Sequence, residues 1–318
     1  MMIRPLLAAV ACCAFIGCNY VAEHAAPKKQ AVTARSADAL KADELFWSTL
    51  HGGEYDQISA ALEAETAAYL QSPNDAITAA HVGWLHIWRI SERQRMASVP
   101  ATITNDTTLA RQYFEQAVAL NPNEARYLGF LASATLAEGN IHHDERETRH
   151  GYFMLLDSIK AWPEFNLFTA GYVMSSQPAE SERFKHALDW QWQTLDVCVG
   201  EKVDRKNGAY AKYMKLETDK GTKRVCWNSW IAPHNFEGFF LNMGDMQVKA
   251  GDWQLGQKLY ANAKLSPTYA QWNYRQVLED RIRDAQQNIT AFNAPLRSPK
   301  GNPMMNSSAF ACMACHAQ

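Results

Sequence analysis

The chain has 318 residues, of which 47% are hydrophobic, a formal net charge of −2, and ten tryptophans. This length and hydrophobic content are sufficient to bury a large core, either in one domain or in an array of helices. Acidic and basic residues are balanced, without a Lys/Arg-rich block, which argues against a nucleic-acid-binding surface. Large aromatic residues at helical spacing usually pack between helices, so we assign the tryptophans to the core.

The first residues have the features of an export signal. Arg4 supplies a positive charge, and an apolar stretch runs from Pro5 to Gly17. This stretch is short for a membrane span but has the length of a signal-peptide hydrophobic region. Its end, Ala14-Phe15-Ile16-Gly17-Cys18, resembles a bacterial lipobox. The resemblance implies a signal peptide over residues 1–17 and lipidation of Cys18; the alternative is an ordinary secretory signal with cleavage nearby.

Residues 18–39 follow this signal and are predicted to form a lipid-anchored, flexible tether. From Tyr20 to about Ala39 the sequence is polar and rich in Ala and Lys, without a strong period. Asn19 follows the predicted lipidated cysteine, at the position where an acidic residue typically retains lipoproteins in the inner membrane. The lipobox resemblance therefore implies an outer-membrane location facing the periplasm.

The cysteines of the exported chain divide into three groups. Cys18 is assigned to the lipid, and Cys312 and Cys315 are assigned below to a cofactor. Cys198 and Cys226 remain, and an oxidising compartment favours their pairing in a disulfide. The alternative is two separate buried thiols.

Residues 40–292 are predicted to form an all-α domain, because Pro and Gly are sparse and the apolar residues follow a helical period. The segment from Ala110 to Pro122 resembles the second helix and exit turn of a tetratricopeptide repeat. In this resemblance Ala110 permits close helix approach, Phe114 fills the hairpin and Ala117 meets the neighbouring helix. Pro122 ends the helix because proline removes a backbone donor.

The same arrangement of small and large residues recurs along the domain. Further helices or hairpins are predicted over residues 53–73, 76–90, 125–140, 151–163, 165–199 and 243–267, with one long amphipathic helix over 267–292. Residues 91–106 and 141–145 are predicted insertions, and 200–224 is a polar excursion. The resemblance to the tetratricopeptide family covers about Asp43 to Phe292, in four to five repeats. It implies a helical-hairpin array whose concave face binds a peptide or protein partner; the alternative is an irregular helical bundle.

Residues 293–318 form a C-terminal arm of different character. Asn293 to Pro303 is rich in turn-forming residues and is predicted to be ordered or semi-ordered. It leads into Ser307 and Ser308, which are N-cap candidates for a short helix ending at His316.

This short helix contains Cys312-Met313-Ala314-Cys315-His316, the C-x-x-C-H signature of c-type haem attachment. Two thiols three residues apart lie on one face of a helical turn, so both can form thioethers with the haem vinyl groups. His316 can then act as the proximal iron ligand. The motif predicts one covalent haem c. The alternatives are a zinc site, which normally needs a second close pair of ligands, and a redox dithiol, which normally needs a thioredoxin-like context.

The second iron ligand must come from upstream, because only two residues follow His316. We expect the helical domain to supply the wall of the haem pocket. The candidate ligands are His142, His143 and His150, in and after the predicted insertion, and Met304 and Met305 on the arm. Other histidines are dispersed along the chain: His51, His81, His86, His186 and His234. Otherwise this side of the iron stays open.

Together these patterns predict a lipid-anchored monohaem c-type cytochrome that transfers electrons and docks a redox partner on its helical array. No phosphate-binding loop, nucleophile elbow or H-E-x-x-H motif is present, so an electron carrier or binding protein is favoured over a hydrolytic enzyme. Two alternatives remain. One is a scaffold lipoprotein that recruits an envelope protein; the other is haem-based peroxidase chemistry or gas binding, which requires an open iron face.

Overall fold

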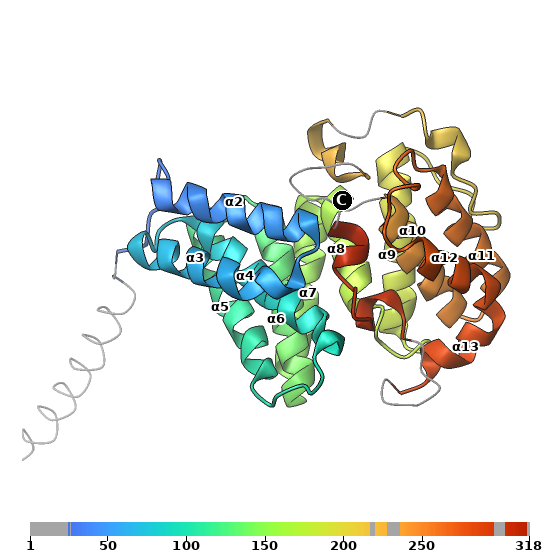
Figure 1. Ribbon diagram of the computed structural model, residues 1–318, viewed down its shortest axis with the longest axis horizontal. Coiled ribbons are helices and arrows are strands. Elements are labelled where there is room, and N and C mark those ends of the chain that lie inside the picture. The colour runs from blue at the N-terminus through green and yellow to red at the C-terminus, as the bar shows by residue number, and fades with distance from the viewer. Residues whose placement is uncertain (1–24, 26, 217–219, 228–235, 296–302, 317–318) are drawn as a thin grey trace, which may run out of the picture.

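The computed structural model describes residues 25, 27–216, 220–227, 236–295 and 303–316, and this part of the chain is helical without a strand (Figure 1). The predicted all-α class is therefore confirmed. The α-helices are α2 (Ala37–Gly52), α3 (Ile58–Gln71), α4 (Ala76–Ser91), α5 (Ile103–Leu120), α6 (Ala125–His142), α7 (Glu145–Ala161), α8 (Pro163–Met174), α9 (Glu182–Val199), α10 (Phe236–Lys249), α11 (Trp253–Asn262), α12 (Arg275–Arg283), α13 (Ala285–Asn293) and α14 (Met313–His316).

Most helices pack against the next helix in the chain. The most extensive pairings join α4 with α5, α6 with α7, α8 with α9 and α10 with α11. Helices α2 to α8 occupy one side of the molecule and α10 to α13 the other, with the last residues of the chain between them (Figure 1). Helix α14 contacts both α10 and α2, so the C-terminus joins helices that are distant in sequence.

Polar side chains mark where several helices begin. Ser36, Asp75 and Asp144 each accept a hydrogen bond from a backbone N–H in the first turn of α2, α4 and α7. These bonds satisfy donors that have no partner within the helix. Gly53 and Gly200 follow α2 and α9 with φ of 66° and 78°, a conformation that glycine adopts without strain.

Small residues allow the central helices to approach closely. Ala110, Phe114 and Ala117 of α5 are fully buried, as the small–large–small pattern predicts. On α7, a Cβ at Gly151 would lie 2.6 Å from the backbone nitrogen of Leu136 on α6. The α6–α7 hairpin therefore packs backbone against backbone at a point where only glycine fits.

The prediction of one long helix over residues 267–292 is wrong. The chain instead forms α12 and α13, with a break at Asp284 (φ −99°, ψ 13°). Residues before Arg275 form turns, and the Thr268 hydroxyl there donates to Glu237 of α10 at 2.8 Å. In the same turns the Thr268 backbone nitrogen donates to Ser266 Oγ at 3.2 Å, and local side-chain bonding of this kind competes with helical backbone pairing.

Two other boundaries differ from those predicted. Helix α5 begins at Ile103, inside the predicted insertion over residues 91–106, and α2 begins at Ala37, inside the predicted tether. Just before α2, Arg35 forms ion pairs with Asp43 and Asp75. The end of the tether is thereby fixed to the helical domain.

Cys198 at the end of α9 and Cys226 form a disulfide with a Cα–Cα distance of 5.9 Å. Both residues are buried, and the bond closes the polar excursion that connects α9 to α10. None of the helices in the described part of the chain combines the length and hydropathy needed to cross a membrane.

We predict that replacing both Cys198 and Cys226 with Ser lowers the free energy of unfolding by about 3–4 kcal/mol, because the disulfide restricts the unfolded chain. Equilibrium urea unfolding of the variant and of the wild type, with and without a reductant, measures the change. The reductant should destabilise only the wild type; equal stability of the two oxidised proteins would contradict the prediction.

Candidate functional site

A cavity of about 500 Å³ is lined by residues of α4, α5, α6, α8 and the C-terminal segment, among them Cys312, Cys315 and His316. Its size lies within the usual range for cofactor and ligand pockets. Most of its wall is apolar, from α4, α5, α6 and α8. The apolar residues include Ile87, Ile90, Ile103, Phe130, Leu136, Ile141, Phe168 and Val173. The predicted haem-attachment residues therefore line a cavity whose wall is mostly apolar.

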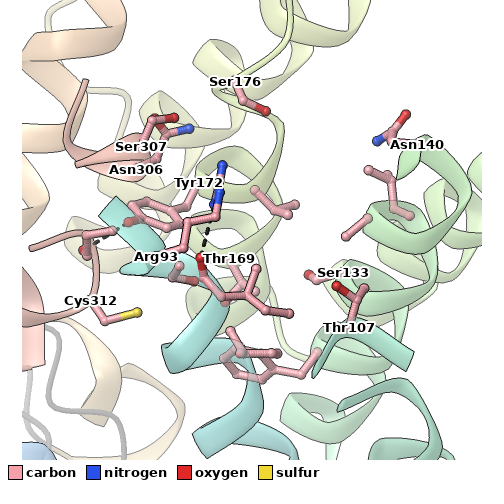
Figure 2. Close-up of a pocket in the computed structure, with 18 of the residues that line it drawn as sticks. Arg93, Thr107, Ser133, Asn140, Thr169, Tyr172, Ser176, Asn306, Ser307 and Cys312 are labelled. Carbon is pink, nitrogen blue, oxygen red and sulfur yellow. Dashed lines mark hydrogen bonds between the residues drawn. The ribbon is translucent and has the colours of Figure 1, made fainter. Parts of the chain in front are cut away.

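The motif itself forms a single helical turn. The backbone nitrogens of Cys315 and His316 both donate to the carbonyl of Cys312 at 3.0 Å, and the nitrogen of Ala314 donates to the carbonyl of Phe310 at 2.9 Å. All three residues of this turn line one cavity. Both cysteines are free thiols, and the Cys312 sulfur points into the cavity (Figure 2).

A carboxylate from the end of α4 holds the start of this turn. Glu92 Oε1 accepts hydrogen bonds from the backbone nitrogens of Cys312 at 3.0 Å and Met313 at 2.9 Å, while Oε2 pairs with Arg95 Nε at 2.7 Å. Glu92 is fully buried, and burial raises its pKa, although the bonds from Met313 and Arg95 oppose that rise. Glu92 thus satisfies two backbone donors that have no helical partner.

Other side chains fix the remainder of the turn. Trp272 Nε1 donates to the carbonyl of Ala314 at 3.0 Å, and the Tyr172 hydroxyl donates to the carbonyl of Ala311 at 2.9 Å. On α10, a Cβ at Gly238 would lie 2.4 Å from the Ala314 oxygen and 2.6 Å from the Cys315 sulfur. The motif is therefore packed tightly on the face opposite the cavity.

A buried polar network holds the arm upstream of the motif. Asp245 accepts from the backbone nitrogen of Met305 at 2.7 Å and from the Tyr260 hydroxyl at 2.6 Å, and it pairs with Arg281 at 3.1 Å. Arg281 also donates to the carbonyl of Pro303 at 2.6 Å. Burial raises the pKa of Asp245, and the Arg281 charge opposes that rise. Residues 303–316 are consequently part of the core.

The environment of the thiols does not favour the two alternative uses of the motif. Burial raises the pKa of Cys312 and of Cys315, whereas a reactive dithiol has a lowered pKa. Across the described ranges, the ligand atoms of Cys312, Cys315 and His316 do not form a cluster close enough for one ion to bridge them. A zinc site requires such a cluster.

The five predicted candidates for the second iron ligand do not line the cavity. His142, His143 and His150 are exposed near the α6–α7 turn. Met304 and Met305 are buried, and Met304 instead lines a neighbouring cavity of about 90 Å³. The packing of the helices decides whether these residues face solvent or the core, and their positions in the sequence do not specify that packing.

The dispersed histidines also lie elsewhere. His51, His81, His86 and His186 are not among the residues that line the cavity, and His86 Nδ1 lies 2.7 Å from Asp106 Oδ1. His234, Cys18 and the predicted signal peptide over residues 1–17 lie outside the described residues. Within the described part of the cavity wall, His316 is the one residue that is either a histidine or a methionine.

Polar residues that the sequence analysis did not identify complete the cavity. Thr107, Ser133 and Asn140 lie across the cavity from Cys312, on α5 and α6 (Figure 2). Ser133 donates to the carbonyl of Gly129 at 2.8 Å, so its hydroxyl hydrogen is used within α6. The sequence analysis missed Thr107, Ser133 and Asn140 because no local motif marks them, and their spacing is that of ordinary core or surface positions of a helix.

A second group of titratable residues is buried away from the cavity. His81 Nδ1 lies 2.9 Å from Asp43 Oδ1 and 3.0 Å from Glu65 Oε1, and its ring stacks on Phe46 at 4.0 Å. Burial is the largest influence on the pKa of His81 and lowers it, but the bonds to both carboxylates raise it overall. Arg35 also pairs with Asp43. We interpret this group as an ionic network that joins α2, α3 and α4.

Comparisons of this chain with protein-family models, with curated proteins and with solved structures find no match. The residues themselves fit a covalently held porphyrin: two thiols and an imidazole converge on a cavity of suitable size with a largely apolar wall.

We predict that Gly238→Ala lowers the free energy of unfolding by about 1–3 kcal/mol, because the added methyl group overlaps the motif turn. The matched control is Gly52→Ala, where the nearest atom to a new Cβ is Glu54 Cγ at 3.2 Å, on a flexible side chain. Equilibrium denaturation measures both variants. Equal stability of the two would show that α10 does not press against the motif as described.

Proposed function

We propose that this chain is a lipid-anchored c-type cytochrome of the cell envelope that carries one covalent haem and transfers electrons. The observation that supports this proposal best is the convergence of Cys312, Cys315 and His316 on one largely apolar cavity of about 500 Å³. A chance C-x-x-C-H sequence would have no reason to face a cavity of cofactor size.

Each residue of the motif has a distinct role in this proposal. Cys312 and Cys315 form the two thioethers, and His316 holds the iron. A haem attached in this way supplies an iron that alternates between two oxidation states. The largely apolar wall would cover part of the bound haem, and the burial of a haem contributes to its reduction potential.

The remainder of the chain places the cofactor and presents it to partners. Lipidation of Cys18 would attach the protein to the membrane, with the outer membrane facing the periplasm as the proposed location. The helical array, which we propose to be tetratricopeptide-like, would dock a redox protein. The small and large residues of α5 and α7 support this part of the proposal.

The scaffold alternative assigns the C-terminal motif a structural or sensory role. The arm contributes fully buried residues to the core, among them Met305, Met313 and Ala314. Its removal would therefore perturb the domain, so truncation does not separate scaffold activity from haem activity. A substitution confined to the attachment sulfurs is the better test.

We predict that replacing Cys312 and Cys315 with Ala abolishes haem that survives denaturation. The variant and the wild type are produced with the haem-maturation machinery, and the native C-terminal peptide is analysed by mass spectrometry. The Cys198→Ser, Cys226→Ser protein is the control, because it also loses two cysteines but keeps the motif. Wild-type peptide without haem mass, or covalent haem in the Cys312→Ala, Cys315→Ala protein, would refute the proposal.

A second candidate function is the binding of a small ligand to the haem. The observation that favours it is the composition of the described cavity wall, where His316 is the one histidine or methionine. The facing wall carries Thr107, Ser133 and Asn140, whose side chains are not strong iron ligands but can bond a small polar ligand.

This second candidate predicts that the reduced wild-type holoprotein has a five-coordinate, high-spin spectrum and binds carbon monoxide. Optical and resonance Raman spectra before and after addition of the gas measure both properties. A six-coordinate, low-spin spectrum that carbon monoxide does not change would exclude this second candidate, and would leave electron transfer as the function.

A further inference from the structure

The turn that follows α4 contacts the haem motif and the cavity at adjacent residues. Glu92 binds the backbone nitrogens of Cys312 and Met313, while Ser91 and Arg93 line the cavity. Within the short 3-10 helix Arg93–Arg95, Arg93 lines the cavity while Arg95 pairs with Glu92. The turn therefore holds the motif through Glu92 and also places the positively charged Arg93 on the wall of the cavity.

Arg93 is distinctive among the charged residues of this region. Apart from His316, it is the one ionisable basic residue on the described cavity wall, and no Asp or Glu lines that wall. Its Nη1 donates to the carbonyl of Ile90 at 3.0 Å. Burial lowers the pKa of Arg93, and no carboxylate among the described residues offsets that effect.

The neighbouring arginines show the contrast. Arg89 pairs with Asp106 at 3.5 Å, and Arg95 pairs with Glu92 at 2.7 Å. For Arg93 the described part of the chain provides no such ion pair. A guanidinium that is partly removed from water without a counterion is unfavourable, and its fork of N–H donors matches a carboxylate or phosphate.

We propose that Arg93 is the anion-binding residue of the cavity and that it pairs with a propionate carboxylate of the haem. This inference rests on the proposed function, since haem supplies the anion. Haem carries two propionates on one edge, and an arginine on the wall fixes where that edge lies. Arg93 and Tyr172 lie on the same side of the cavity as the motif (Figure 2).

This pairing would also affect the iron. A positive charge close to the porphyrin in a low-dielectric cavity disfavours the oxidised state, which carries one more positive charge. Arg93 therefore raises the reduction potential in addition to positioning the haem. Because Glu92 is its neighbour in sequence, the same turn would fix the attachment peptide and the haem edge relative to each other.

The test compares three variants of the full-length holoprotein. Arg93→Gln removes the charge, Arg93→Lys keeps the charge but loses the planar fork, and Arg89→Gln removes a paired charge from the same end of α4. Arg89 does not line the cavity. The readouts are the equilibrium reduction potential and the propionate-bending band in resonance Raman spectra.

We expect Arg93→Gln to lower the reduction potential and to shift the propionate band. Arg93→Lys should keep most of the wild-type potential but still show an altered band. Arg89→Gln should change neither the potential nor the band by a comparable amount. Equal shifts in Arg93→Gln and Arg89→Gln, or an unchanged band in both Arg93 variants, would overturn the role of Arg93. If Arg93→Gln does not acquire haem, Arg93→Lys alone decides through the band. Wild-type protein without haem would instead refute the proposed function.

Discussion

The Glu92 carboxylate accepts hydrogen bonds from the backbone nitrogens of Cys312 and Met313, and the position of the motif turn depends on this contact. A four-residue helix such as α14 is not stable by itself, because helix nucleation is costly. Residues outside the helix stabilise it: Glu92 accepts hydrogen bonds from the N–H groups at the start of the turn, and Trp272 donates to the Ala314 carbonyl. The rest of the site follows from that arrangement, since the turn then places Cys312, Cys315 and His316 on the wall of one cavity.

A second buried carboxylate, Asp245, holds the C-terminal arm between two groups of helices. Asp245 and Arg281 bind the backbone at Met305 and Pro303, and both side chains are almost fully buried. Buried ion pairs contribute little net stability, but the loss of one partner leaves an uncompensated charge. We infer that this network specifies the path of the arm more than it increases stability. The structure thus uses buried charges at two points to guide a segment whose own sequence has low helical preference.

The same physical reasoning links the cavity to both proposed properties of the haem. Charges interact more strongly beside an apolar wall, so the Arg93 guanidinium, which has no carboxylate partner among the described residues, would have a larger effect than a surface arginine. The absence of another histidine or methionine from the described wall leaves Thr107, Ser133 and Asn140 facing the motif. If the proposed haem is bound, electron transfer and binding of a small ligand would differ in what occupies the side of the iron away from His316, and the spectrum of the holoprotein would distinguish them.

The sequence by itself determined the helical class, the approximate limits of most helices and the candidate attachment residues Cys312, Cys315 and His316. These are local features: helical periodicity depends on residues three or four apart, and the motif spans five consecutive residues. Only the tertiary structure decided that Glu92 holds the motif from 220 residues away, that Arg93 lines the cavity, and that His142, His143, His150, Met304 and Met305 do not. It also replaced the long helix predicted over residues 267–292 with turns followed by α12 and α13, and the Thr268 hydroxyl in those turns bonds Glu237 on α10. Contacts between distant segments depend on how whole helices pack, and a local pattern of residue types does not specify that packing.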